Sequence, residues 1–265
     1  MSVFGFIGVG NMGGALARAV AKNISPENIM VSDYDSEKAK SVADELGAVV
    51  SDNAAIAEKA DCIFIGVKPQ VIEAVLGSIA PTLSQRDSRF VFISMAAGVS
   101  IENVQKYSGG KYPVIRIMPN LPVQVREGAI LYTPSDETCD RDEKNFLQAL
   151  DGCGSLIKLK EDLINVGMAV SGCGPAFVDL FTEAMADGAV ACGLPRNIAQ
   201  QLAVQTIKGS AVLAQKTGKN PAVLKDEVCS PGGTTIQGVR KLEESGFRAA
   251  VMNAVIAAYE KNFNL

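Results

Sequence analysis

The sequence predicts an α/β fold in which a doubly wound parallel sheet is followed by an all-helical domain. Up to about Lys160, short apolar runs typical of strands alternate with helical stretches, which is the pattern of a parallel sheet covered on both faces. After Glu161 no convincing strand remains, and glycine and proline turns separate the helical runs. A glycine-rich turn also follows the first strand-like run directly. We therefore expect one domain at residues 1–160 and a second at residues 161–265.

The first strand is expected at Val3–Ile7, and it leads into a glycine turn and then a helix over Ala15–Ala21. This order of strand, turn and helix is that of the dinucleotide fingerprint, in which the glycines allow the turn, the approach of a pyrophosphate and close helix packing. The candidate cofactor-binding residues of the turn are Gly8, Val9, Gly10, Asn11, Met12 and Gly13.

The second strand, expected at Ile29–Ser32, supports this interpretation of the turn. It ends in Asp33, which lies 20 residues past Gly13, where the fingerprint places an acid that binds the ribose. A chance glycine turn is the alternative, and the surrounding strand–turn–helix–strand order argues against it. We expect the first domain to be of the Rossmann type and to bind a dinucleotide.

Further apolar runs extend the predicted sheet. The expected strands are Cys62–Val67, Phe90–Ser94, Val114–Met118, Ala129–Thr133 and Ser155–Lys158, with a helix over Arg141–Leu150 before the last. Ligands of open α/β sheets bind beyond the carboxyl ends of the strands, so the loops after Gly66 and Ser94 are candidates for the cofactor site. Lys68 could meet the phosphates or ribose, or could be an ordinary solvated lysine. The loop Met118–Pro122 is expected near the nicotinamide end.

The segment Ser230-Pro231-Gly232-Gly233-Thr234-Thr235 is the most informative stretch of the second domain. Serine at an N-cap and proline at the first helical position predict a helix that begins at Pro231. Glycines cost helix stability, and bare backbone at Gly232 and Gly233 would leave free N–H groups that favour a carboxylate. Thr235 adds a hydroxyl beside them. The alternative is a well-capped helix packed tightly against a neighbour.

Composition excludes several classes of function. The 265 residues are 48% apolar and 20% charged, which is ordinary for a globular protein, and the net charge of −4 without a basic cluster argues against nucleic acid as a partner. No signal peptide or membrane span is expected, since the uncharged stretch Asn165–Val178 is short and contains glycines and a proline.

The cysteine and histidine counts bound the chemistry. The six cysteines never form a C-x-x-C pair, so we expect reduced thiols, a cytoplasmic location and no metal site. Histidine is absent, which excludes Ser-His and Cys-His catalysis.

One helical run predicts an oligomer. The stretch Ala249–Ala258 is apolar nearly all round, and a helical domain of about a hundred residues has few fully internal positions. Burial by a second subunit is therefore expected, which predicts an obligate dimer.

With these residues assembled, the chain resembles the pyrroline-5-carboxylate reductases from end to end. The most specific part is Leu224–Glu244, and supporting stretches are Phe6–Gly13, Val67–Pro69, Ser94–Gly98, Arg116–Gly128 and Ala169–Ala176. The resemblance implies a Rossmann domain, a helical dimerisation domain interleaved with its partner, often a ring of dimers, and the last step of proline biosynthesis.

The resemblance also implies site residues. Those implied for the dinucleotide, NADPH or NADH, are Gly8 to Gly13, Asn53, Val67, Lys68, Pro69, Ala96, Ala97 and Gly98, with Ser32 and Asp33 at the end of the second strand. Those implied for the substrate are Ser230, Gly232, Gly233, Thr234 and Thr235. As a mechanistic hypothesis, Thr235 is the catalytic residue and its hydroxyl can hydrogen-bond the ring nitrogen. Asp33 is a departure, because it should repel a 2′-phosphate, although Ser32 and Lys38 could soften that penalty.

Two competing interpretations remain. The β-hydroxyacid dehydrogenases also join a Rossmann domain to a helical one, but they use a lysine on the first long helix of the second domain, and no lysine or arginine lies between Lys160 and Arg196. A non-catalytic redox sensor would explain the glycine turn, but it would not explain a pocket for an anion at Gly232 and Gly233.

Overall fold

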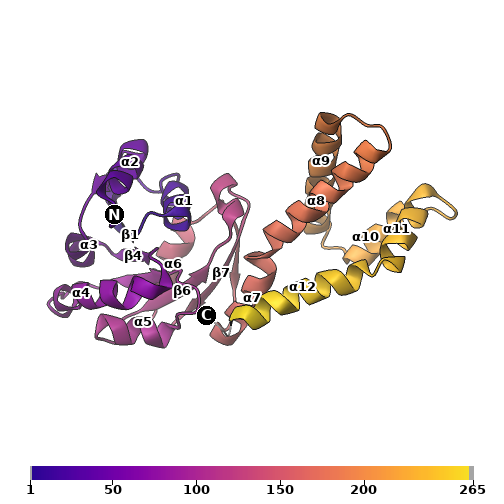
Figure 1. Cartoon of the computed structure of the whole chain (residues 1–265). Helices are drawn as coiled ribbons and strands as arrows, with labels where there is room; N and C mark the ends of the chain where they lie inside the picture. The colour runs from indigo at the N-terminus through magenta and orange to yellow at the C-terminus, as the bar shows by residue number, and fades with distance from the viewer. Residues whose placement is uncertain (1, 263–265) are drawn as a thin grey trace. The chain divides into compact units, whose positions relative to one another are not determined.

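The structure is a computed structural model, and it describes residues 2–262. The chain forms two compact units, one of residues up to Gly172 together with Lys261 and one of Cys173–Glu260 (Figure 1). We call them the N-terminal and the C-terminal unit. The division lies one helix later than the boundary expected after residue 160. The cause is helix α7, Glu161–Ser171, whose Ile164 packs with Met118 and Leu131 of the sheet.

The N-terminal unit is an eight-stranded sheet in the order β3-β2-β1-β4-β5-β6-β7-β8. Its strands are β1 Phe4–Ile7, β2 Ile29–Ser32, β3 Val49–Val50, β4 Cys62–Ile65, β5 Val91–Ser94, β6 Val114–Met118, β7 Gly128–Pro134 and β8 Gly154–Lys158. Every pairing is parallel except that of β6 with β7, which is antiparallel. The predicted strands are confirmed, whereas the two-residue β3 and the direction of β7 were not foreseen.

Helices cover both faces of this sheet. They are α1 Asn11–Val20, α2 Ser36–Leu46, α3 Asn53–Lys59, α4 Ile72–Ser84, α5 Ile101–Ser108 and α6 Asp140–Ala149, with short 3-10 turns η1 Pro26–Asn28, η2 Pro69–Val71 and η3 Leu121–Val125. Successive strand residues alternate between two cores, so that Phe6 packs with Leu16 and Phe146 while Ile7 packs with Ile56 and Leu76. The doubly wound fold is therefore confirmed.

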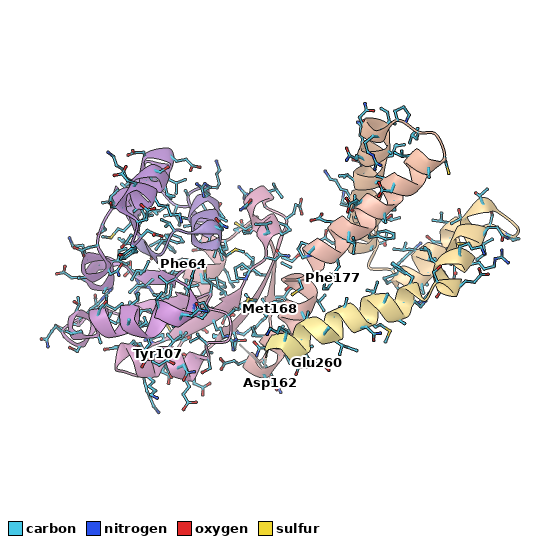
Figure 2. All side chains as sticks on the ribbon, in the orientation of Figure 1. Phe64, Tyr107, Asp162, Met168, Phe177 and Glu260 are labelled. Carbon is cyan, nitrogen blue, oxygen red and sulfur yellow. The ribbon has the colours of Figure 1, made fainter. Side chains whose placement is uncertain are left out.

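The C-terminal unit is entirely helical and buries very little. Its helices are α8 Gly174–Ala191, α9 Arg196–Thr217, α10 Pro221–Val228, α11 Thr234–Glu244 and α12 Phe247–Asn262. Among its described residues only Ala186, Ala199 and Ala203 are buried. Several apolar side chains of α12 stand exposed in the single chain, including Met252 at 63%. Figure 2 draws the side chains along these helices. These helices cannot be stabilised by a core of their own.

The segment Glu161–Ala191 is long and apolar enough, by length and composition, to cross a membrane, and a window within it reaches a mean hydropathy of 1.4. The sequence analysis did not identify this segment as a candidate membrane span. In the structure the segment is divided at Gly172 into α7 and α8, and Ile164 and Met168 of α7 pack on the sheet. Helices that bury a face in a subunit interface are rich in apolar residues, as are helices that span a membrane. Composition alone therefore does not distinguish the two kinds of helix.

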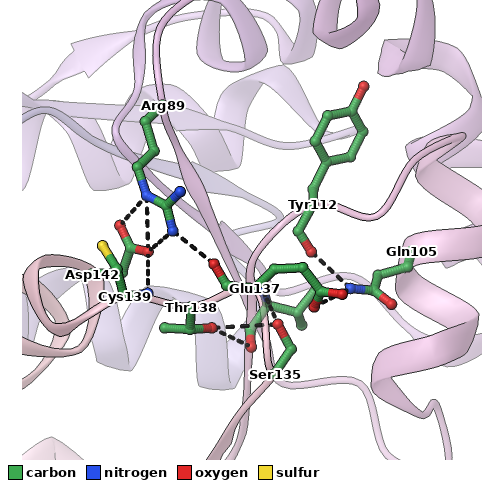
Figure 3. A network of polar contacts seen from close by, with 9 residues as sticks. Arg89, Gln105, Tyr112, Ser135, Glu137, Thr138, Cys139 and Asp142 are labelled. Atoms are coloured by element: carbon green, nitrogen blue, oxygen red, sulfur yellow. Dashed lines mark hydrogen bonds and ion pairs between the residues drawn. The ribbon is translucent and has the colours of Figure 1, made fainter.

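A polar network holds α5, α6 and the loop before β5 together (Figure 3). The Arg89 guanidinium donates to the buried Asp142 carboxylate at 2.5 Å and to the Glu137 carbonyl at 2.7 Å. Asp142 also accepts the backbone N–H of Cys139, and Gln105 donates to the Glu137 carboxylate. Burial alone would raise the pKa of Asp142, but these donors outweigh it and hold that pKa below its ordinary value.

Replacing Asp142 tests this network. We expect Asp142→Asn to lower the free energy of unfolding at neutral pH by about 1–3 kcal/mol, because the Arg89 partner is lost at a buried position. Since the folded pKa of Asp142 is depressed, its contribution is present above its unfolded pKa and disappears as the pH falls below about 4. Urea unfolding at pH 7 and at pH 3 measures both effects.

The exposed pair of Arg18 and Glu45 supplies the control. We expect Glu45→Gln to cost less than about 1 kcal/mol at pH 7. Equal losses for the two variants would contradict the importance of the Arg89–Asp142 contact.

Candidate functional site

Close backbone packing explains two glycines of the turn after β1. Gly8 has a positive φ of 92°, and a Cβ there would come within 2.8 Å of the Gly66 carbonyl carbon. A Cβ at Gly13 would overlap the Gly8 carbonyl oxygen. Helix α1 therefore packs directly against the ends of β1 and β4, as the fingerprint requires.

Gly10 has a different environment. It is the N-cap of α1, it provides no side-chain cap, and a Cβ built on it would meet no atom within 4 Å. No acid lies in the first turn of α1, and in residues 2–262 the N–H groups of Asn11, Met12 and Gly13 have no hydrogen-bond acceptor. Free amides at the positive end of a helix form an anion site suited to a pyrophosphate.

Asp33 is anchored to the glycine turn. Its Oδ2 accepts the backbone N–H of Val9 at 2.8 Å, and its Oδ1 accepts that of Asp35 at 3.1 Å. The Gly8 N–H donates to the Ser32 carbonyl, which joins the same two segments. The end of β2 is therefore fixed beside the turn, with a carboxylate held at the predicted position of the ribose.

A pocket of about 540 Å³ opens beside Asp33. It is lined by Ile7, Gly8, Ser32, Asp33, Tyr34, Asp52, Asn53, Ala54, Val67, Val71, Val75, Ser78 and Ile79. The structure thus brings together five predicted cofactor residues: Gly8, Ser32, Asp33, Asn53 and Val67. Within the pocket, the Ser32 hydroxyl donates to the side-chain oxygen Oδ1 of Asn53 at 2.6 Å. The side-chain nitrogen Nδ2 of Asn53 makes no hydrogen bond to the described chain.

Sequence reasoning missed the wall that η2 and α4 contribute to this pocket. Val71, Val75 and Ser78 recur at helical spacing after the predicted loop at Lys68, so one face of the helix lines the pocket. This helical spacing is the sequence signal from which the pocket wall could have been predicted. Tyr34, fully exposed at the pocket rim, directly follows the predicted acid.

The other predicted cofactor residues lie outside this pocket. Lys68 and Pro69 are exposed at η2, and Ala96 is buried in the core beneath the loop after β5. Ala97 packs near Met118, and Gly98 has a positive φ of 73° with open space around it. Their contact with a dinucleotide stays a prediction.

A buried cation in the middle of β6 was also missed. Arg116 is 4% exposed, and it donates to the Glu161 carboxylate and to the Asn165 carbonyl oxygen, each at 3.1 Å. The same Glu161 oxygen accepts the Ile101 N–H. In the loop expected near the nicotinamide, Asn120 is buried and donates to the Ser171 carbonyl. These groups fix α7 to the sheet. Their contacts join residues that are distant in the sequence, so no local sequence pattern reveals them.

The S-P-G-G segment corrects the predicted helix start. Ser230–Gly233 forms a turn in which the Gly233 N–H donates to the Ser230 carbonyl at 3.0 Å, with Gly232 at a positive φ of 69°. This hydrogen bond and this φ are typical of a type II turn, which has proline at its second position and glycine at its third. Helix α11 therefore begins at Thr234, three residues later than expected, and Ser230 is not its N-cap.

This correction relocates the free amides of α11. Gly233 is the N-cap and its own N–H is used in the turn, so the N–H groups left without an acceptor in the described chain are those of Thr234, Thr235 and Ile236. No acid lies in the first turn. A Cβ at Gly233 would overlap the Ser230 hydroxyl oxygen, so a side chain there would require the Ser230 hydroxyl to move. The exposed start of α11 suits a small carboxylate.

A doubly wound sheet with an open amide site after β1, followed by a poorly buried helical unit, defines a Rossmann-type dinucleotide-binding protein with a helical second domain. Residues 161–265 match the family described as pyrroline-5-carboxylate reductase dimerisation, and residues 3–98 match the one described as NADP oxidoreductase, coenzyme F420-dependent.

Individual relatives agree. The pyrroline-5-carboxylate reductase of Methanosarcina acetivorans is 41% identical over 98% of this chain and 97% of its own length. A pyrroline-5-carboxylate reductase structure from Coxiella burnetii matches with a TM-score of 0.92 at 30% identity, over 99% of this chain and 98% of that one. The Plasmodium falciparum pyrroline carboxylate reductase structure with NADP bound matches with a TM-score of 0.84 at 34% identity, over 98% of this chain and 97% of that one. The chain belongs to the pyrroline-5-carboxylate reductase family.

Gly10 and Gly13 give a matched test of the turn. We expect Gly10→Ala to weaken NADPH and NADH binding at least about tenfold with a loss of stability of about 0.5 kcal/mol or less, because the new methyl group meets no protein atom. Gly13→Ala should lower stability by about 1–3 kcal/mol, because its methyl group overlaps the Gly8 carbonyl. Nicotinamide fluorescence titration measures the cofactor affinity of each variant, and thermal unfolding measures its stability. Unweakened cofactor binding by Gly10→Ala would exclude the turn as the pyrophosphate site.

Proposed function

We propose that this chain reduces 1-pyrroline-5-carboxylate to L-proline with NADPH or NADH, the last step of proline biosynthesis. Family membership over nearly the whole chain supports the activity. The single structural observation that carries it is the pair of helix starts without side-chain caps, one after β1 for a pyrophosphate and one at α11 for a carboxylate.

The start of α11 holds the substrate carboxylate in this proposal. The N–H groups of Thr234, Thr235 and Ile236 donate to its oxygens, and the positive end of the helix dipole stabilises its charge. The turn at Ser230–Gly233 keeps side chains away from these amides, with the Ser230 hydroxyl close to Gly233 as a further donor.

The ring nitrogen needs a hydrogen-bond partner but no dedicated acid. The bound cofactor supplies a hydride to the imine carbon, and the nitrogen gains the electron pair of the C=N bond. Because the chain has no histidine, we infer that the imine arrives protonated from solvent and that the Thr235 hydroxyl orients its nitrogen.

We also propose that the chain works as a homodimer in the cytoplasm, with dimers assembling further into a ring. The dimerisation family match covers the C-terminal helices, and those helices expose large apolar side chains such as Leu180 at 68% and Met252 at 63%. A second copy of the same helices offers the matching apolar surface.

A spectroscopic assay tests the activity. The absorbance of reduced nicotinamide should fall when pyrroline-5-carboxylate is added with NADPH or NADH, and L-proline should form in equal amount. Cofactor binding without turnover would contradict the proposal and favour a redox sensor instead.

Thr235 gives a sharper test through two matched variants. We expect Thr235→Val, which keeps the shape and removes the hydroxyl, to lower kcat by about one to three orders of magnitude with unchanged cofactor affinity. Thr235→Ser keeps the hydroxyl and should retain most of the activity. Steady-state kinetics and cofactor titration measure both, and an unchanged kcat for Thr235→Val would remove this residue from the mechanism.

The dimer gives a further prediction. We expect a dimer in sedimentation at micromolar concentration, and we expect Met252→Glu to raise its dissociation constant at least about a hundredfold, because a charge would be buried in an apolar interface. Gln85→Glu, which adds the same charge on the exposed end of α4 in the N-terminal unit, should have no effect. A stable wild-type monomer at this concentration would contradict the dimer.

A further inference from the structure

The pocket beside Asp33 is lined by carboxylates and by no cation. Of its lining residues only Asp33 and Asp52 carry a charge, and both are acidic. Lys38, which the sequence offered as a residue that could soften the repulsion by Asp33, does not line the pocket and is exposed on α2. A ligand group that carried a negative charge here would meet two carboxylates at close range.

The helix starts near the pocket are also closed to anions. Asp35 caps α2, and its Oδ1 accepts the N–H groups of Glu37 and Lys38 at 3.1 and 3.3 Å. Asp52 caps α3 through the Ala55 N–H at 2.7 Å. These amides are occupied by the protein's own carboxylates, in contrast to those of α1 and α11.

We propose that Asp33 makes this enzyme select NADH over NADPH, an inference that rests on the proposed placement of the adenosine ribose in this pocket. The two cofactors differ only at the ribose 2′ position, which carries a hydroxyl in NADH and a phosphate of roughly −2 charge in NADPH. The hydroxyl donates to the anchored Asp33 carboxylate, which has lone pairs left after accepting Val9 and Asp35.

The phosphate finds no compensation at the same place. The Asn53 amide nitrogen is a neutral donor that can serve either cofactor, and Ser32 already donates its hydroxyl to Asn53. Charge repulsion from Asp33 and Asp52 is therefore not offset by any lining residue. The relative from Plasmodium falciparum was solved with NADP bound, so family membership alone does not predict a preference for NADH.

Cofactor kinetics and binding test the selection. For the wild type we expect both kcat/KM and affinity to favour NADH over NADPH at least about tenfold at low ionic strength. Asp33→Asn, which keeps an oxygen for the Val9 N–H and removes the charge, should lower that ratio about tenfold or more. Asp44→Asn removes the same charge from an exposed position on α2 outside the pocket and should leave the ratio unchanged.

Salt dependence gives a second readout that needs no variant. Because the discrimination is electrostatic, raising the ionic strength should narrow the NADH preference, mainly through tighter relative binding of NADPH. Wild-type preference for NADPH, or an equal ratio in Asp33→Asn and the wild type, would overturn the proposal.

Fluorescence titration with NADH and NADPH alone separates this proposal from the proposed activity. A binding ratio that favours NADH and collapses in Asp33→Asn supports the selection even if the imine is not reduced. Turnover of the imine with a preference for NADPH would leave the activity standing and reject the selection, and absence of binding by both cofactors would reject it as well.

Discussion

Uncapped backbone amides at the starts of two helices are the feature on which the proposed function depends. Helices α1 and α11 share a glycine N-cap, no side-chain cap and no acid in the first turn, whereas α2 and α3 close their first turns with Asp35 and Asp52. A helix start binds an anion only where the protein leaves its N–H groups free. A glycine N-cap together with a first turn free of acids therefore marks the two starts at which we propose that a pyrophosphate and a carboxylate bind.

The second constraint is the lack of a core in the C-terminal unit. Three buried alanines cannot offset the conformational entropy lost by five helices, whereas the N-terminal unit has two cores, one on each face of the sheet. In the proposed dimer, association through the exposed apolar faces supplies the missing burial. The start of α11 belongs to this unit, so the order of the proposed carboxylate site depends on assembly.

The strands and the glycine turn could be predicted because each is a local signal. Apolar runs bounded by turns give the strands, and the spacing of Gly8, Gly10 and Gly13 gives the turn. The start of α11 was placed wrongly because Pro231 suits the second position of a type II turn as well as a helix start, and the positive φ of Gly232 decides between them. The antiparallel β7 and the contacts of Arg116 depend on pairings distant in sequence, which no local pattern contains.

Asp33 links the proposed cofactor selection to the shape of the turn, so only a replacement that keeps a hydrogen-bond acceptor can change one without the other. One carboxylate accepts the Val9 N–H, which holds the glycine turn against β2, and also faces the pocket where the ribose is proposed to bind. A side chain that lacked an acceptor would remove the charge and release the turn together, so a loss of pyrophosphate binding would obscure any gain at the ribose. A change towards NADPH therefore requires a replacement that still accepts the Val9 N–H, together with a cation supplied from another pocket residue. The wall formed by η2 and α4 offers neutral positions for it, at Val71 and Ser78.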